Sequence, residues 1–121
     1  MVTPQRARTA LATVRLINGA LGLVAPMVLL RRLGFDATTG RAGVYPFRMF
    51  GVRTLLIGAD LLLLDGEERR RATRVAVLIH AADTVSAACA GITGDLPRRA
   101  AIMTTALSAC NTVLAVLALG D

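Results

Sequence analysis

Lysine and tryptophan are missing from this chain of 121 residues, and only four of its residues are aromatic. All fourteen basic residues are therefore arginines, and with eight acidic residues they give a net charge of +6. Such a charge could serve a DNA-binding surface. These arginines flank long apolar segments, however, where lipid headgroups and the positive-inside rule account for them. We therefore expect no nucleic-acid partner.

Residues that bind metals or form disulfides are also scarce. The chain has one histidine and two cysteines, and their spacing matches no metal motif. Cys89 and Cys110 both fall inside apolar segments, at different depths if the helices are antiparallel. We expect two small buried thiols, no disulfide, no metal and no cofactor. Phosphate-binding loops and Ser-His-Asp arrangements are likewise missing from the sequence.

Apolar residues are abundant, and they are gathered into four long segments. They make up 55% of the chain and concentrate in residues 10–30, 44–64, 75–94 and 100–120. A helix needs ~20 residues to cross the hydrocarbon core of a bilayer. A chain of this length holds one domain. We therefore expect an all-α, single-domain bundle of four antiparallel transmembrane helices, with an uncleaved first helix kinked at Pro26.

The second segment is the most polar of the four, because it contains Arg48, Arg53 and Asp60. An ionised residue at the centre of a membrane helix costs ~2.5–3.5 kcal/mol on the insertion scale. The apolar side chains of the segment offset that cost, so the net free energy of inserting the segment is near zero. We therefore expect these charges to have partners on neighbouring helices.

The arginines between the segments give the orientation. The amino-terminal tail and residues 65–74 hold six arginines, against five in residues 31–43 and 94–99. The positive-inside rule then places both termini and the second loop in the cytoplasm. We expect a multi-pass protein of the bacterial inner membrane that contacts membrane lipids.

Polar residues of all four segments fall in the half of the membrane nearest to the termini. They lie within ~10 Å of depth, given a rise of 1.5 Å per residue. Arg15 and Asn18 lie on one face of their helix. The same holds for His80 and Asp83, and for Arg53 and Asp60. The fourth segment adds Asn111.

The charges of this cluster balance, and we expect them to pair. Arg53 is predicted to reach Asp83, which leaves Asp60 to meet His80 or Arg15. Arg15 and Arg48 are predicted to extend towards lipid headgroups. His80 is predicted to be a hydrogen-bonded helix residue and no metal ligand. Such a cluster either joins helices at ~0.6 kcal/mol per hydrogen bond or forms a working site, and the sequence leaves both open.

Three functions compete. In the first, a dry pocket binds a lipophilic molecule or transforms it by isomerase- or cyclase-like chemistry. The acid–base residues would then be Asp60, His80 and Asp83, and the ligand-binding residues Arg53, Asn18, Asn111 and Arg15. The second is a non-catalytic accessory subunit of a larger membrane complex. The third is an oligomeric transporter. Whether the chain is an enzyme stays open.

Small residues recur every four positions along the third segment, at Ala82, Ser86, Ala90 and Gly94. Small side chains let another membrane helix approach closely. We expect a homo-oligomer or a larger assembly that uses this stripe.

The stretch FRMFGVRTLLIGADLLL, followed about twenty residues later by HAADTVSA, resembles a pattern in small four-helix membrane proteins of actinobacteria. These proteins are loosely similar to the DoxX-like group. The pattern corresponds here to Arg48, Gly51, Arg53 and Asp83, and the resemblance covers about half of the chain. It implies the fold and the membrane location. DoxX-like proteins are often associated with redox partners, but nothing in this sequence supports a quinone or haem site.

Overall fold

The computed structural model describes residues 2–120, apart from the side chain of Thr39, and the regular secondary structure of this part of the chain is entirely helical. The prediction of an all-α fold is confirmed. The described residues form five α-helices and one short 3-10 helix. They are α1 (Pro4–Val24), α2 (Pro26–Arg32), η1 (Thr39–Gly43), α3 (Val44–Leu63), α4 (Gly66–Thr93) and α5 (Arg98–Ala118).

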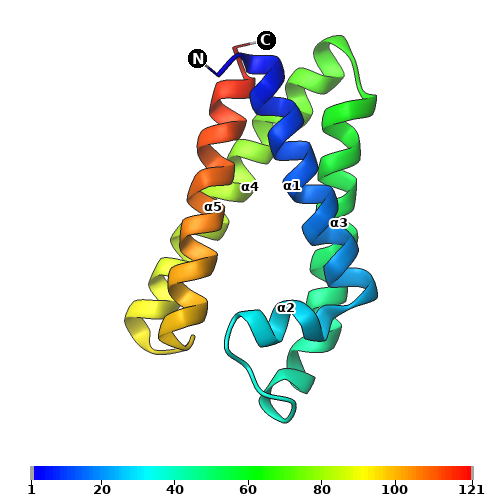
Figure 1. Cartoon of the computed structure of the whole chain (residues 1–121). Helices are drawn as coiled ribbons and strands as arrows, with labels where there is room; N and C mark the ends of the chain where they lie inside the picture. The colour runs from blue at the N-terminus through cyan, green and yellow to red at the C-terminus, as the bar shows by residue number, and fades with distance from the viewer. Residues whose placement is uncertain (1, 121) are drawn as a thin grey trace.

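The four long helices alternate in direction along the chain (Figure 1). Both ends of the chain and the α3–α4 turn lie at one end of the molecule, which we call the near end. The α4–α5 turn, α2 and η1 lie at the opposite, far end. α1 packs along α3 and α4 along α5, and the two pairs meet through α1–α5 and α3–α4 contacts. The arrangement agrees with the expected placement of both termini and the second loop on one side.

The first apolar segment does not form the single kinked helix expected over residues 10–30. α1 ends at Val24, and α2 leaves at 110° to it. The break falls at Ala25, whose backbone is non-helical (φ −136°, ψ 60°) and which precedes Pro26. The proline ring disfavours helical geometry in the residue before it, and proline suits the first position of a new helix. α2 therefore lies across the far end (Figure 1).

The charged segment expected as a loop over residues 65–74 is helical instead. α4 begins at Gly66, and its first turn carries Glu67 and Glu68, which suit the positive end of the helix dipole. Arg69 lies 3.8 Å from Asp65, and Arg74 lies 3.7 Å from Glu67. The i,i+4 spacing of Asp65 and Arg69 stabilises a helix. With 28 residues, α4 is about 42 Å long, so its charged end extends past a hydrocarbon core of ~30 Å.

Two helices of the described chain, α4 and α5, are long and apolar enough to cross a membrane. The bent pair α1–α2 makes a third if it counts as one span. α3 has a comparable length of 20 residues but carries Arg48, Arg53 and Asp60. The chain thus has two to three helices that meet the length and hydropathy of a membrane span.

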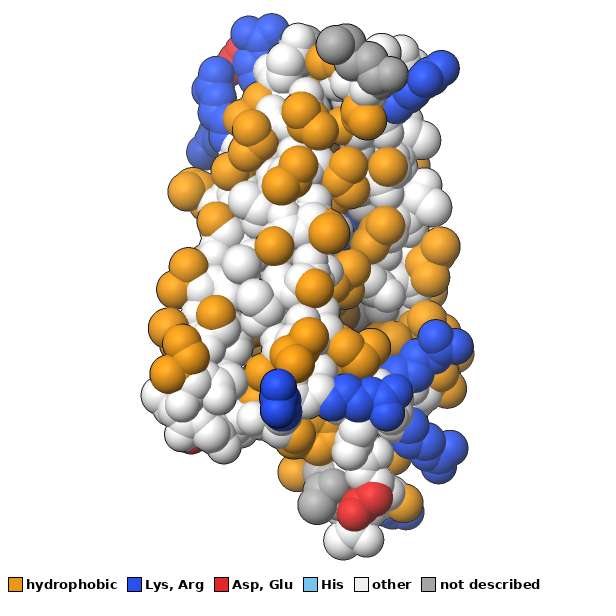
Figure 2. Space-filling model, turned by 60° about the vertical axis from the view of Figure 1, so that its left-hand side comes forward, with side chains coloured by type: hydrophobic (Ala, Val, Ile, Leu, Met, Phe, Trp, Pro, Cys, Tyr) orange, Lys and Arg blue, Asp and Glu red, His pale blue; other side chains and the backbone are white. Residues whose placement is uncertain are grey.

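Most large apolar side chains of the described residues point outwards, and most buried apolar side chains are small. Eight of the eleven buried hydrophobic residues are alanines. Leu63, Leu78 and Ile92 are 78%, 70% and 87% exposed. Figure 2 shows apolar side chains spread over the middle of the surface, with arginines gathered towards both ends. Cys89 and Cys110, expected to be buried, are both exposed free thiols. The interior is therefore built mostly from small residues, with Leu11, Leu30 and Leu61 as the buried leucines.

Glycines allow the backbones of α1 and α3 to touch. A Cβ atom on Gly51 would lie 2.5 Å from the Leu23 nitrogen and 2.7 Å from the Gly19 oxygen. A Cβ atom on Gly58 would lie 3.1 Å from the Ala12 oxygen. Close packing through small residues was predicted from the sequence only for residues 82–94. The sequence signal for the α1–α3 contact was the spacing of Gly51 and Gly58, which stand seven residues apart on one face of α3.

Replacing Gly51 with alanine should therefore destabilise the protein. Helix propensity alone predicts that the free energy of unfolding rises by up to ~1 kcal/mol. The clash with α1 predicts instead that it falls by about 1–3 kcal/mol. The sign of the change separates the two effects. Thermal unfolding in detergent measures it, with Val52→Ala on the exposed side of α3 as the control. A melting temperature of Gly51→Ala at or above that of the wild type would contradict the packing described.

Candidate functional site

A hydrogen bond at the centre of the bundle joins Arg15 of α1 to His80 of α4. The Arg15 Nη1 atom lies 3.3 Å from His80 Nδ1, and the two residues are 3% and 0% exposed. Arginine has only donors, so Nδ1 accepts, and the imidazole is the neutral form with its proton on Nε2. The Phe50 ring of α3 lies 5.6 Å from the Arg15 guanidinium carbon, within the range of a cation–π contact. One arginine thus connects three helices.

This pairing corrects two expectations. Arg15 does not extend towards the surface but is buried, while Arg48 on α3 is exposed. Asp60 was predicted to meet His80 or Arg15, and those two residues bind each other instead. The reason is geometric. The close α1–α3 contact holds the Arg15 side chain within the bundle, where His80 offers the nearest acceptor.

Buried polar atoms surround the Arg15–His80 bond. Thr54 of α3 is fully buried and Asn111 of α5 is 1% exposed, so each long helix contributes at least one polar side chain to the interior. Within the described residues, four of their atoms lack a hydrogen-bond partner: Arg15 Nε, Thr54 Oγ1, His80 Nε2 and Asn111 Oδ1. Buried polar groups of this kind are ordinarily satisfied by ordered water. We call these four residues the polar layer.

The polar layer contains one residue that the sequence analysis missed and leaves one predicted residue at its edge. Thr54 was overlooked, although it stands three residues after Gly51 and four before Gly58 on the face that meets α1. Asn18 is half-buried on α1, one turn beyond Arg15. On α5, the Thr112 hydroxyl lies 3.4 Å from that of Thr84, which donates to the His80 carbonyl at 2.7 Å.

The predicted pair of Arg53 and Asp83 is present. The Arg53 Nη2 atom lies 3.4 Å from Asp83 Oδ2, and this bond connects α3 to α4. The two side chains are 50% and 31% exposed, so the pair lies at the surface of the bundle and not inside it.

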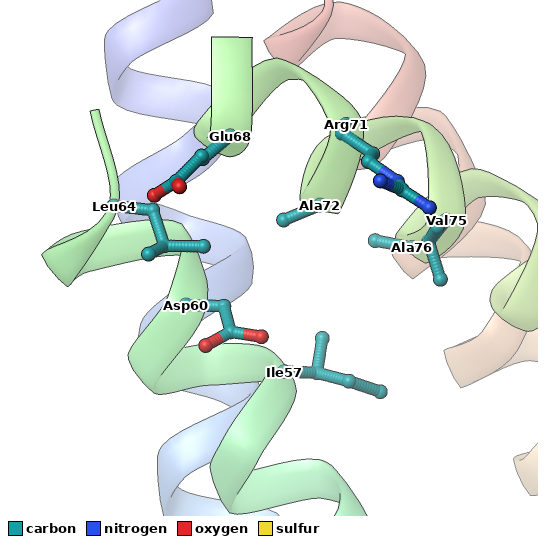
Figure 3. A pocket seen from close by; sticks show the side chains of 8 residues that line it. All are labelled: Ile57, Asp60, Leu64, Glu68, Arg71, Ala72, Val75 and Ala76. Atoms are coloured by element: carbon teal, nitrogen blue, oxygen red, sulfur yellow. The ribbon is translucent and has the colours of Figure 1, made fainter. Parts of the chain in front are cut away.

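An open groove of about 400 Å³ runs between the end of α3 and the first turns of α4. Its walls are largely apolar, and charged groups stand at its rim. Figure 3 shows the carboxylates of Asp60 and Glu68 on one side of this space and Arg71 on the other. The remaining lining residues are Ile57, Leu64, Ala72, Val75 and Ala76. A volume of this size fits a small-molecule ligand.

The three residues proposed as acids and bases therefore lie in three settings. Asp60 lines the groove, His80 is buried against Arg15, and Asp83 pairs with Arg53. The structure brings Arg15 and His80 together, and Arg53 and Asp83 together. No family model, curated protein or solved structure matches this chain. The function is therefore inferred from the side chains themselves.

Breaking the Arg15–His80 bond from one side should cost more than removing it altogether. His80→Leu leaves a buried guanidinium without its acceptor, which we expect to cost about 3 kcal/mol. In the double variant with Arg15→Met no charge is left unpaired, so much of that loss should be recovered. Denaturation of both single variants and the double variant in detergent measures the coupling. Arg48→Met, an exposed arginine on α3, is the matched control, and strictly additive losses would show that the bond does not connect the helices.

Proposed function

We propose that this chain is an integral membrane protein that crosses the bilayer four times and holds a lipophilic molecule in the Asp60 groove. The membrane location rests on the outward large apolar side chains and the inward small ones. Soluble monomers rarely expose apolar surface on this scale. Membrane bundles, by contrast, pack through small residues because lipid tails are as apolar as leucine.

α1 and α3 serve as two of the four crossings in this proposal. α1 is 21 residues long, or about 31 Å, which matches the thickness of a hydrocarbon core. It meets the hydropathy of a span together with α2, which lies across the far end. In α3, Arg48 and Asp60 lie near the two ends of the helix, where long polar side chains reach water. Only Arg53 is at mid-depth, and Asp83 partners it. The apolar side chains of a helix can offset the insertion cost of a single paired charge.

We place the near end in the cytoplasm of a bacterial inner membrane. The near end holds Arg6, Arg8, Arg69, Arg70, Arg71 and Arg74, and the far end holds Arg31, Arg32, Arg41, Arg98 and Arg99. Arg48 lies within α3 and is not counted, and the remaining excess of one arginine favours the near end as the cytoplasmic side. The resemblance to DoxX-like membrane proteins is consistent with this location.

The groove at Asp60 supports binding of a molecule with an apolar body and a basic polar end. Its apolar walls open sideways, towards the lipid of the proposed bilayer. Its rim has two carboxylates and one guanidinium, for a formal charge of −1. Asp60 lies one turn from the end of α3, at the level where headgroups begin. A long-chain amine would place its tail along Ile57 and Val75 and its ammonium at Asp60.

Binding fits this geometry better than acid–base catalysis does. An isomerase or cyclase needs its acid and base within reach of the same substrate atoms. Asp60 faces the groove, whereas His80 and Asp83 each contact an arginine elsewhere. The alternative role, an accessory subunit, is favoured by one observation: Ala82 and Ser86 of the small-residue stripe are exposed and free to meet another helix.

Binding can be tested with three probes of equal chain length: tetradecylamine, tetradecanoic acid and tetradecanol. Titration calorimetry of the detergent-solubilised protein should show the amine binding most tightly. Asp60→Asn should weaken amine binding by about tenfold, equal to ~1.4 kcal/mol, and Ala72→Phe should fill the groove and block all three probes.

The matched control is Asp95→Asn, an exposed carboxylate beside the far-end turn. It should leave amine affinity unchanged. A wild-type protein that binds none of the probes, or unaltered binding in both groove variants, would remove the basis of the proposed ligand.

A further inference from the structure

Arg53 and Asp83 form an ion pair at the depth where a bilayer tolerates it least. Arg53 is the tenth of the 20 residues of α3, about 14 Å from the far end of that helix. Asp83 stands ten residues before Thr93, the end of α4, or about 15 Å from it. In a hydrocarbon core of ~30 Å, both residues lie at the middle.

The pair is also incompletely satisfied. One contact of 3.4 Å joins it, although a guanidinium has five N–H donors and a carboxylate can accept about four hydrogen bonds. Half of the Arg53 side chain and 31% of Asp83 are exposed. Lipid tails offer neither donors nor acceptors, and an ionised group in contact with them is expensive. Another polar surface must therefore cover the pair.

We infer that this surface is a second copy of the chain, whose Asp83 and Arg53 face Arg53 and Asp83 of the first. A two-fold axis along the membrane normal keeps each residue at its own depth. Because the two charges are opposite and lie side by side, such an axis sets each one against its complement. Closed two-fold dimers are the commonest assemblies of identical chains. The inference rests on the bilayer location proposed above.

The helix face next to Asp83 is shaped for a close neighbour. Ala82 and Ser86 are exposed, and Ala90 is half-exposed. These residues are not used within the chain, because α4 meets α5 through a different side: a Cβ atom on Gly91 would lie 2.6 Å from that of Ala101. Small residues on an open face allow a second backbone to approach. The charges then determine how the two copies align, and the small residues leave room for the second backbone.

An exchange of the two charges within one chain tests the inference without breaking its internal pair. The variant Arg53→Asp/Asp83→Arg keeps one charge of each sign in every copy, so it should fold and form dimers with itself. Mixed with wild type, it sets arginine against arginine and aspartate against aspartate. Two differently tagged forms, co-expressed and purified from membranes in mild detergent, report which copies associate.

We expect wild-type copies to pull down each other, the exchanged form to pull down itself, and mixed pairs to fall at least tenfold. Conversely, the single variants Arg53→Asp and Asp83→Arg should associate with each other when co-expressed but not with themselves. Ser86→Leu, which leaves both charges intact, should lower the dimer fraction by steric hindrance.

Indiscriminate mixing of wild type with the exchanged form would overturn the inference, as would a monomeric wild type in lipid nanodiscs. A chain absent from the membrane fraction would instead overturn the proposed location. The two failures are therefore distinguishable.

Discussion

Close contact between helices is the constraint on which the rest of this structure depends. The α1 and α3 backbones touch at Gly19 and Gly51, and the shared core of the four long helices is built mostly from alanine. Helices this close leave little room between them, so most large apolar side chains point outwards, while Leu11, Leu30 and Leu61 are buried. An exterior of that kind is costly in water and neutral in lipid. The same contact therefore explains the narrow interior and supports the proposed membrane location.

The narrow interior also explains why its polar groups lie where they do. Arg15, Thr54, His80 and Asn111 each come from a different helix and are almost completely buried. Arg15 reaches His80 and Phe50 because α1 is held against α3 at Gly51 and Gly58. Joining helices by hydrogen bonds at their centre leaves the Asp60 groove and the Arg53–Asp83 pair on the outer α3–α4 face. Those two features are where the proposed ligand and the proposed second chain would bind.

The sequence predicted the helical fold, the shared end of the termini and the Arg53–Asp83 pair, because these depend on segment lengths and on depth along a helix. It missed the sharp bend at Ala25, since proline in a membrane helix commonly gives only a kink. It placed Arg15 towards the surface, because depth alone does not tell which way a long side chain turns. The groove at Asp60 could not be predicted from the sequence either, because it depends on the start of α4 at Gly66, which brings Glu68 and Arg71 opposite α3.

The proposed four crossings of the bilayer can be tested directly by a single measurement. In a background with Cys89→Ala and Cys110→Ala, single cysteines can be placed at Arg41, Glu67 and Arg98, which are all exposed. A membrane-impermeant maleimide added to intact spheroplasts should label the cysteines at positions 41 and 98, and the cysteine at 67 only after lysis. Labelling of positions 67 and 98 from the same side would mean that α4 does not cross the membrane, and the four-crossing arrangement would be wrong.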